Sequence, residues 1–392
     1  MLGFWSNDDA NLKILRQAEA KLIEYAKSFG DRDPNSYEIV VNDTPISKDA
    51  LPLKNKKKKQ GGGEDLFLHS VCVQASEKDR LFSKSTPLVI LHGYMNGAMY
   101  FYRNMVGLST YFDKVYSLDT LGCGLSSRCP NLLWSDVIDS TVNTTESVFV
   151  ESVEEWRKAN NIPKMVLAGH SMGGYIAVAY CERYPQNVEQ LVLLSPVGVP
   201  YPDLDRVERF KGGMSFTGRT TFLLFRQLFD LGITPPKFLR TLPTGRGRSM
   251  IESYIDGRLP AITDEAEQQV LADYLYTNAI LPGCGEDMLN RFLTSTAYAK
   301  VPTIDRIPNL KIPKVSFIYG SYDWMDIGGG MEVSQRCGNA TSPNVDVHEL
   351  RHAGHLLMLD NWRGFNAAVI GMCGGKSMLS PYFPSAMRNY NW

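Results

Sequence analysis

The fold of this chain is indicated first by the stretch Met165-Val166-Leu167-Ala168-Gly169-His170-Ser171-Met172-Gly173-Gly174. An apolar run typical of a buried strand leads into G-x-S-x-G, and a segment of helical composition follows it. So tight a turn imposes strained backbone angles on Ser171, and Gly169 and Gly173 relieve the crowding around it. The Ser171 hydroxyl is then held exposed at the start of a helix, which makes Ser171 the candidate nucleophile. A glycine-rich turn that only packs a helix on a strand is the alternative.

Alternating strand and helix patterns surround this stretch. Short apolar runs bounded by Gly, Pro or Asp lie at 88–91, 115–118, 165–168, 191–194, 315–319 and, more weakly, 345–347. Helical patterns lie at 98–111, 140–160, 173–184 and 362–371. The alternation predicts an α/β fold, with a mostly parallel sheet and helices on both of its faces. Ligands bind at the carboxyl ends of such strands, so functional residues are expected in the loops that follow the runs.

The alternation of strand and helix patterns is interrupted at 199–308. This stretch is mostly helical and aromatic-rich, with many Gly and Pro breaks. This stretch predicts a cap inserted between two strands. The expected boundaries are 1–64 for an N-terminal arm, 65–198 and 309–372 for the core, 199–308 for the cap and 373–392 for a C-terminal tail.

The arm is expected to hold an amphipathic helix at about residues 10–29, followed by a linker rich in Lys and Gly. We expect the apolar stripe of this helix to pack on the core. The alternative is a membrane-surface helix with Phe4 and Trp5 as anchors.

Composition excludes several classes of protein. The 392 residues include 41 Lys and Arg against 42 Asp and Glu, and this balance excludes a protein that binds nucleic acid through overall positive charge. The seven Cys and six His are scattered, no C-x-x-C occurs and only His352 and His355 lie close together. Neither a metal site nor a disulfide framework is therefore expected. The chain lacks a signal-peptide pattern and any run of about 20 apolar residues, so a cytoplasmic protein with reduced thiols is expected.

Two backbone amides are candidates for an oxyanion hole. One belongs to Met172, the residue after the candidate nucleophile, and the other to Tyr94, which follows the apolar run 88–91 and His92-Gly93. Gly93 allows the backbone to approach closely. Two such N–H groups can receive the negative charge of a tetrahedral intermediate. For His92 we expect a structural role, bracing this loop.

A serine nucleophile also needs an imidazole within reach and an acid that orients it. His355, which follows the last predicted strand, is the candidate base, and His352 is the alternative. His170 is set aside because an adjacent residue in this turn points elsewhere. The acid is expected after the run 315–319, where Asp323 occupies a G-x-x-D turn and Asp326 is the alternative. The acid that is not used is expected to cap the next helix or turn.

Together these features resemble the α/β-hydrolase fold superfamily over about residues 66–372, including its order of Ser, acid and His. Asp119-Thr120-Leu121-Gly122-Cys123-Gly124-Leu125-Ser126 looks like the D-x-x-G-x-G-x-S turn after that fold's fourth strand. Five flanking sequence segments are similar to those of one lipid-metabolising subfamily. This subfamily contains soluble lysophosphatidic acid acyltransferases, N-acyl-phosphatidylethanolamine lipases, the fungal mitochondrial cardiolipin deacylase and the lipid-droplet lipase coactivator. These segments are Asp65–Val71, Ser126–Arg128, Phe149–Arg157, Tyr319–Asp326 and His355–Asn361.

The resemblance implies acyl chains, phospholipid-like substrates and a membrane or droplet surface. It also implies a motif H-x4-D credited with acyl transfer, which here joins His355 to Asp360. Asp360 or Asn361 would serve equally well as the N-cap of the final helix. Coactivator members of the subfamily lack the nucleophilic Ser, whereas this chain has Ser171, which favours an enzyme.

The first half of the cap differs in charge from the rest of the chain. Residues 206–258 contain ten Lys and Arg against four Asp and Glu, together with six Phe. Basic and aromatic side chains in one segment suit an anionic lipid surface or a phosphate head group. The alternative is a cap whose aromatic residues fill its own core while its Arg side chains are solvated.

We therefore predict a serine-dependent lipid acyl hydrolase of phospholipase or lysophospholipase type, which acts through an acyl-enzyme and needs no cofactor. Alternatives are a lysophosphatidic acid acyltransferase with acyl-CoA as co-substrate, a non-catalytic lipid-surface scaffold or lipase coactivator, and a peptidase of the same fold. The expected partners are a phospholipid or lysophospholipid, and the surface of a lipid droplet, mitochondrion or endoplasmic reticulum. The sequence leaves the head group, the acyl position, the organelle and the oligomeric state open.

Overall fold

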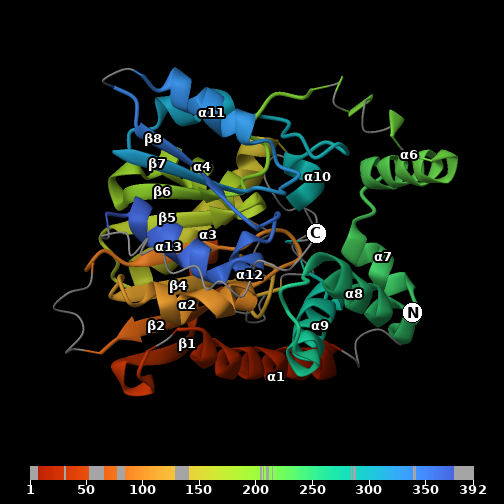
Figure 1. The fold of residues 1–392 in the computed structure, drawn as a ribbon, viewed down its shortest axis with the longest axis horizontal. Helices are drawn as coiled ribbons and strands as arrows, with labels where there is room; N and C mark the ends of the chain where they lie inside the picture. Colours follow the sequence, from red (N-terminus) through yellow and green to blue (C-terminus); the bar gives the residue numbers. More distant parts are fainter. Residues whose placement is uncertain are drawn as a thin grey trace.

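Figure 1 shows the computed structural model, in which an eight-stranded sheet lies between two layers of helices. The structure describes residues 8–30, 32–52, 66–76, 84–128, 141–203, 205, 207–208, 212–213, 215–283, 285, 288–338 and 341–374. The strands are β1 Tyr37–Ile46, β2 Leu66–Ala75, β3 Leu88–Leu91, β4 Lys114–Leu118, β5 Met165–His170, β6 Val188–Leu194, β7 Lys314–Gly320 and β8 Asn344–Leu350. They are arranged in the order β1-β2-β4-β3-β5-β6-β7-β8.

Six of these strands contain the apolar runs from which the sheet was predicted. The pairs from β4 to β8 in this order are all parallel, whereas β1 and β2 are antiparallel to their neighbours. Helices cover both faces of the sheet (Figure 1). The predicted α/β fold with a mostly parallel sheet is confirmed.

The central strands contribute side chains to two separate cores, one on each face. Met165 and Leu167 of β5 pack in one core with α3 (Val142–Ala159), α4 (Met172–Arg183) and α11 (Ile327–Arg336). Val166 and Ala168 pack in the other core with α2 (Tyr102–Leu108), α12 (Leu357–Asp360) and α13 (Trp362–Met372). Both faces are therefore buried, which is why these strands are continuous apolar runs in the sequence.

Neither β2 nor the edge strand β1 was among the predicted strands. Of the two, β1 lies further from the prediction. It pairs with β2 in antiparallel register from Tyr37–Ala75 to Ile46–Leu66, and it lies in the segment 1–64 for which we expected only a helix and a linker. The assignment of that segment needs this correction. Several residues of β1 are exposed, and the strand includes Asn42, Asp43 and Pro45, so it lacks the apolar run by which the buried strands were recognised.

The N-terminal helix α1 (Asp8–Ala26) packs on the core, as expected from its apolar stripe. Leu15, Ala18 and Leu22 are buried against α2 and the helix α9 (Glu265–Ile280). Phe4, Trp5 and the Lys- and Gly-rich linker lie outside the described residues. No helix among the residues that the structure describes is both long and apolar enough to cross a membrane.

Between β6 and β7 the chain forms a run of helices in the stretch predicted to be a cap. They are α6 Phe216–Asp230, α7 Pro235–Thr241, α8 Thr244–Arg258, α9 Glu265–Ile280 and α10 Met288–Phe292. In Figure 1, α6 to α9 lie together on one side of the sheet, beyond the ends of the strands. These helices therefore lie beyond the loops in which functional residues are expected.

Candidate functional site

The turn at Ser171 has the strained geometry that its sequence predicts. β5 ends at His170, and Ser171 is the N-cap of α4 with φ 52° and ψ -116°, a left-handed φ that costs a non-glycine residue about 1–3 kcal/mol. A Cβ on Gly169 would lie 2.4 Å from the carbonyl oxygen of Gly173, and a Cβ on Gly173 would lie 2.4 Å from that of Leu91. Both glycines are therefore required by backbone contacts, and the turn presents the Ser171 side chain.

Three side chains from separate loops form a hydrogen-bonded chain that begins at this turn. The Ser171 Oγ lies 3.1 Å from Nε2 of His355, and Nδ1 of His355 lies 3.1 Å from Oδ1 of Asp323. Asp323 follows β7 and His355 follows β8, so the loops after three strands meet at one end of the sheet. The serine, imidazole and carboxylate predicted from sequence are thus brought together.

The carboxylate of Asp323 is buried but charged. Its side chain is 1% exposed, and burial alone would raise the pKa of this group. The hydrogen bond and the charge of His355 outweigh that effect, with help from the Met325 N–H at 3.0 Å, and hold the pKa of Asp323 below its usual value. An ionised acid in this position fixes the orientation of the imidazole and stabilises its protonated form.

The two alternatives weighed from sequence occupy other positions. Asp326 is the N-cap of α11 and accepts a hydrogen bond of 2.9 Å from the Gly328 N–H, which is the role expected for the unused acid. His352 is exposed, with φ 57°, and its backbone N–H donates to the Ser321 hydroxyl. The hydrogen-bonded chain contains Asp323 and His355.

The loop after β3 lies close against the Ser171 turn. A Cβ on Gly93 would lie 2.8 Å from Nδ1 of His170 and 3.2 Å from the Cβ of Ser171, so glycine at this position permits the close approach of the two turns. Tyr94 and Met172 both line the cavity into which Ser171 opens, and their amides remain our candidates for the oxyanion hole. His92 is fully buried and braces the loop: its Nδ1 donates to the Gly93 carbonyl at 2.7 Å, and its Nε2 accepts from an N–H beyond β4 at 3.0 Å.

The D-x-x-G-x-G-x-S turn was noted in the sequence without a role. Its first residue, Asp119, is fully buried and accepts a hydrogen bond of 2.6 Å from the Ala98 N–H and another of 2.6 Å from the Leu125 N–H. A Cβ on Gly97 would lie 2.7 Å from the same carboxylate. Asp119 therefore holds the end of the loop that carries Gly93 and Tyr94.

His170 supports His355 through the backbone. Its Nε2 donates to the carbonyl oxygen of His355 at 2.9 Å, and the two rings lie 4.9 Å apart. Burial, together with the charge of His355, lowers the pKa of His170 to about 3, so the ring is neutral. Sequence reasoning set His170 aside as a base and did not find this positioning role. The signal would have been a His next to the nucleophile in a turn with no room for solvent.

Asp360 supports the same loop from the other side. Its Oδ2 accepts a hydrogen bond of 2.8 Å from the Gly354 N–H, immediately before His355. Burial raises the pKa of Asp360 to about 6. Asn361, the other candidate, is the N-cap of the final helix α13 and accepts from the Gly364 N–H. The H-x4-D spacing thus corresponds here to a contact between Asp360 and the loop that carries His355.

A cavity of about 480 Å³ opens above Ser171 and His355. Core loops form its floor and the cap forms its walls. The cap contributes mainly apolar side chains, which include Phe229, Pro235, Phe238, Leu239, Met250, Ile251, Tyr254, Leu275 and Leu293. Neither Asp nor Glu is among the described residues that line it. Such a cavity suits a long apolar group whose reacting end lies at Ser171.

The described cationic side chains of the cap differ in their partners. Arg248 pairs with Glu252 and Asp273. Lys237 and Arg240 donate to backbone carbonyls, and Arg226 donates to the Ser295 hydroxyl. Arg206, Arg209 and Lys211, three of the ten cations counted in the sequence, lie outside the described residues.

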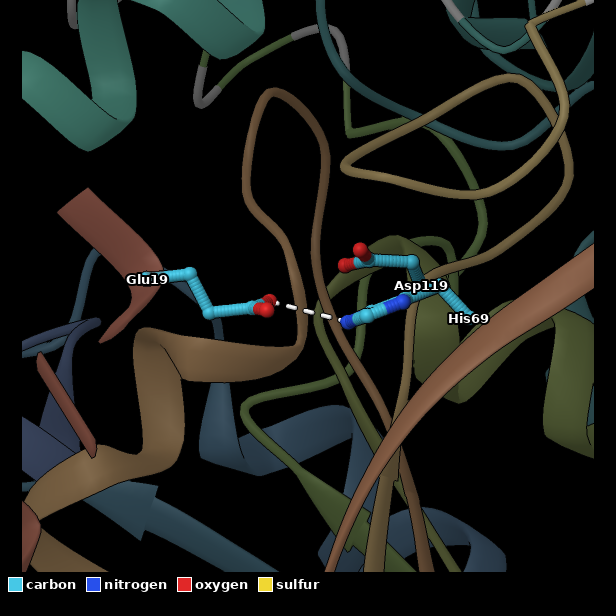
Figure 2. A group of neighbouring side chains, drawn as sticks. All are labelled: Glu19, His69 and Asp119. Atoms are coloured by element: carbon cyan, nitrogen blue, oxygen red, sulfur yellow. Dashed lines mark hydrogen bonds and ion pairs between the residues drawn. The ribbon is translucent and has the colours of Figure 1, made fainter. Parts of the chain in front are cut away.

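A further group of buried polar side chains lies beneath α1. Figure 2 shows Glu19 of α1, His69 of β2 and Asp119, which offer atoms of metal-ligand type within 4.8 Å of one another. Both ring nitrogens of His69 are engaged, however, with Nδ1 2.6 Å from Asp43 and Nε2 3.0 Å from Glu19. The Asp119 oxygens are likewise engaged by the backbone N–H groups described above.

The charge of His69 decides what this group is. Burial acts to lower the pKa of His69, but the Glu19 hydrogen bond, the charges of Asp119 and Glu19 and the Asp43 hydrogen bond outweigh it and raise the pKa to about 9. The ring is therefore a cation at neutral pH, which does not ligate metals. The arrangement is a buried ion-pair network that ties α1 and β1 to the sheet next to the loop held by Asp119.

Comparisons with known proteins agree with this architecture. The alpha/beta hydrolase fold family matches residues 86–361. The 1-acylglycerol-3-phosphate O-acyltransferase ABHD5 of Rattus norvegicus is 32% identical, over 74% of this chain and 78% of that protein. The (lyso)-N-acylphosphatidylethanolamine lipase of Mus musculus is 29% identical, over 83% of this chain and 85% of that protein. A probable 1-acylglycerol-3-phosphate O-acyltransferase of Oryza sativa subsp. japonica is 29% identical, over 79% of this chain and 71% of that protein.

Solved structures show the same fold at lower identity. Carboxylesterase CesB from Bacillus subtilis has a TM-score of 0.52 and 17% identity, covering 94% of this chain and 99% of that one. A bacterial membrane phospholipase A has a TM-score of 0.56 and 17% identity, and the match covers 93% of this chain and 91% of that one. The resemblance to a lipid-metabolising subfamily is confirmed by the acyltransferase and lipase relatives. Because the sheet, the Ser171 turn and a match that spans most of the core all agree, the chain belongs to the alpha/beta hydrolase fold family.

Proposed function

We propose that this protein is a serine-dependent lipid acyl hydrolase of phospholipase or lysophospholipase type. The observation that carries the proposal is the hydrogen-bonded chain of Ser171, His355 and Asp323 at the floor of an apolar cavity. A nucleophile, a base and an orienting acid in this order and spacing suit acyl transfer through a covalent intermediate.

In the proposed mechanism, Nε2 of His355 removes the proton from Ser171 as its Oγ attacks the acyl carbonyl carbon. The charge of Asp323 stabilises the imidazolium that forms. The backbone N–H groups of Met172 and Tyr94 donate to the oxyanion of the tetrahedral intermediate. His355 then protonates the leaving oxygen, and an acyl-Ser171 ester remains. Water, activated by His355, attacks this ester, and the fatty acid leaves with regeneration of the serine.

Two observations support a lipid as the substrate. The cavity walls contributed by the cap are mainly apolar, and relatives of this chain are named as a (lyso)-N-acylphosphatidylethanolamine lipase and as 1-acylglycerol-3-phosphate O-acyltransferases. An acyl chain enclosed among Phe229, Leu239 and Ile251 would place its ester carbonyl at Ser171. Burial of each methylene group there contributes about 0.8 kcal/mol to binding.

The cap also supports peripheral contact with a lipid surface. Leu223 and Leu224 of α6 are 53% and 54% exposed, and Leu231, just after α6, is 77% exposed. The exposed Arg219 lies on the same helix. Exposed apolar side chains beside cations suit the head-group region of an anionic membrane or droplet.

A second candidate function is acyl transfer to a lysophosphatidic acid, with acyl-CoA as the acyl donor. It is favoured by the names of the relatives in rat and rice. The same acyl-Ser171 ester would then be attacked by a lysophospholipid hydroxyl in place of water. This requires exclusion of water from the cavity.

The test uses wild-type protein and Ser171→Ala, with a fluorophosphonate probe and a panel of lipids with and without acyl-CoA. We expect the probe to label the wild type and not the variant, and free fatty acid to be released from phospholipid or lysophospholipid only by the wild type. A diacyl product that depends on acyl-CoA would favour the transferase. Absence of labelling in folded wild type would instead support a scaffold, and activity confined to peptides or short esters would refute the lipid proposal.

A further inference from the structure

Arg226 of α6 contacts a residue that lines the cavity. It is half-buried on α6, and its Nε donates to the Ser295 hydroxyl at 3.3 Å. Ser295 lines the cavity, as does Phe229, which lies three residues after Arg226 and so on the same face of the helix. The guanidinium is therefore held next to the space that the substrate would occupy.

The charge of Arg226 is not balanced by the described protein. Among the described residues no ion pair joins Arg226 to Asp or Glu, and no carboxylate side chain lines the cavity. Arg248 of the same cap, in contrast, pairs with two carboxylates. A partly buried cation without a counter-charge is unfavourable, and an anionic ligand would relieve that cost.

Ser295 is presented by a tight turn. The turn is closed by a bridge between Leu293 and Ala299 and by the Thr294 N–H, which donates to the Tyr298 carbonyl at 2.8 Å. Ala297, in the same turn, has a left-handed φ of 62°. The Ser295 oxygen accepts from Arg226, so its own proton is available to donate to a ligand. A guanidinium and a hydroxyl donor are thus positioned side by side.

We infer that Arg226 and Ser295 form a subsite for the phosphate of a glycerophospholipid or lysophospholipid whose acyl ester lies at Ser171. The inference rests on the proposed function and names the residues that would bind the phosphate of its substrate. The planar guanidinium offers several N–H donors that match phosphate oxygens, and Ser295 donates to a further oxygen. Neutral acylglycerols reach the same cavity but leave this subsite empty.

The test compares 1-oleoyl-lysophosphatidic acid with 1-oleoylglycerol, which share acyl chain and glycerol and differ only in the phosphate. Both are presented in the same neutral detergent micelles at fixed ionic strength and without acyl-CoA, whose own phosphate groups would otherwise compete. We expect Arg226→Gln to lower the ratio of kcat/KM for the phosphate-bearing lipid to that for the neutral lipid about 10-fold or more. Arg226→Lys, which keeps the charge, recovers part of that ratio.

Arg246→Gln is the matched control, because Arg246 is an exposed cation on α8 of the same cap. For this variant, the ratio of kcat/KM for the phosphate-bearing lipid to that for the neutral lipid should equal the wild-type ratio. An equal fall in both substrates for Arg226→Gln, or an equal change of the ratio for Arg246→Gln, would overturn the subsite and leave general cap electrostatics as the explanation.

A binding measurement separates this inference from the proposed function. Ser171→Ala protein, with and without Arg226→Gln, is titrated with the same two micelles. Tighter binding of the phosphate-bearing lipid that is lost with Arg226 supports the subsite even if the wild type hydrolyses neither lipid, in which case the hydrolase proposal alone fails. Equal affinity of Ser171→Ala protein for the two micelles refutes the subsite, whatever the hydrolytic activity.

Discussion

Replacement of Asp360 by Asn should stabilise the protein at neutral pH, although Asp360 is half-buried and hydrogen-bonded. Burial raises its pKa to about 6, from an ordinary value near 3.8. The folded state then binds the proton more tightly than the unfolded state, so stability falls as the pH rises from about 4 through 6. A difference of about two pKa units corresponds to a loss of about 3 kcal/mol in the free energy of unfolding at pH 7.5. This value is an upper bound, because partial exposure of the Asp360 side chain reduces it.

The Asn side chain keeps the hydrogen bond to the Gly354 N–H, because its Oδ1 can accept in place of the carboxylate oxygen. Its amide group adds donors that cost about 1 kcal/mol if they find no partner. We therefore expect Asp360→Asn to raise the free energy of unfolding by about 1–2 kcal/mol at pH 7.5. The gain should vanish or reverse below pH 4, where Asp360 is protonated in both states.

Urea denaturation of wild type and variant at a series of pH values between 4 and 8 measures this difference directly. Asp326→Asn serves as the control, since Asp326 caps α11 and Asn caps helices about as well as Asp. A loss of stability at pH 7.5, or a difference independent of pH, would refute the reasoning. The same variant separates support of the His355 loop from acyl transfer: a structural role predicts parallel changes in hydrolysis and transfer, whereas selective loss of transfer would assign Asp360 to that step.

Two further predictions concern the other buried charges. His69 has a folded pKa of about 9 against an ordinary 6.5, so its contribution is fully present below pH 6.5 and is lost as the pH rises through 9. His69→Gln should thus cost a few kcal/mol more at pH 6 than at pH 10 in chemical denaturation, and a penalty that does not change with pH would contradict the ion-pair network. Asp323→Asn should lower kcat by about four orders of magnitude in an ester hydrolysis assay, as removal of the orienting acid does in other triads, while Asp326→Asn changes it less than about threefold. A larger loss of kcat in Asp326→Asn than in Asp323→Asn would show that Asp326, and not Asp323, orients His355.

Much of the fold was predictable because its signals are local. A strand buried on both faces needs a mostly apolar run, and the five strands β3 to β7 each carry one. The edge strand β1 lacks such a run, because exposed positions accept polar residues, and it was missed. The turn at Ser171 was predictable for the same local reason, since only glycine fits where Gly169 and Gly173 meet the backbone.

The supporting residues of the site were not predictable in this way. His170 contacts the carbonyl of His355 across 185 positions of sequence, and Asp119 reaches the amide of Ala98 from another loop. Neither contact leaves a spacing pattern, because each partner lies on a different element. The partners become neighbours only when the carboxyl ends of parallel strands meet.

The sequence by itself determined the α/β class, the strained turn at Ser171, the inserted cap and a short set of candidate acids and bases, because each depends on residues adjacent in the chain. Only the tertiary structure decided between Asp323 and Asp326 as the partner of His355. It also assigned Asp360 to the loop before His355 and brought Arg226 beside Ser295. These choices depend on distances of about 3 Å between separate elements. Such distances are set by how the strands align and how the cap packs over them, and no local pattern of residues encodes them.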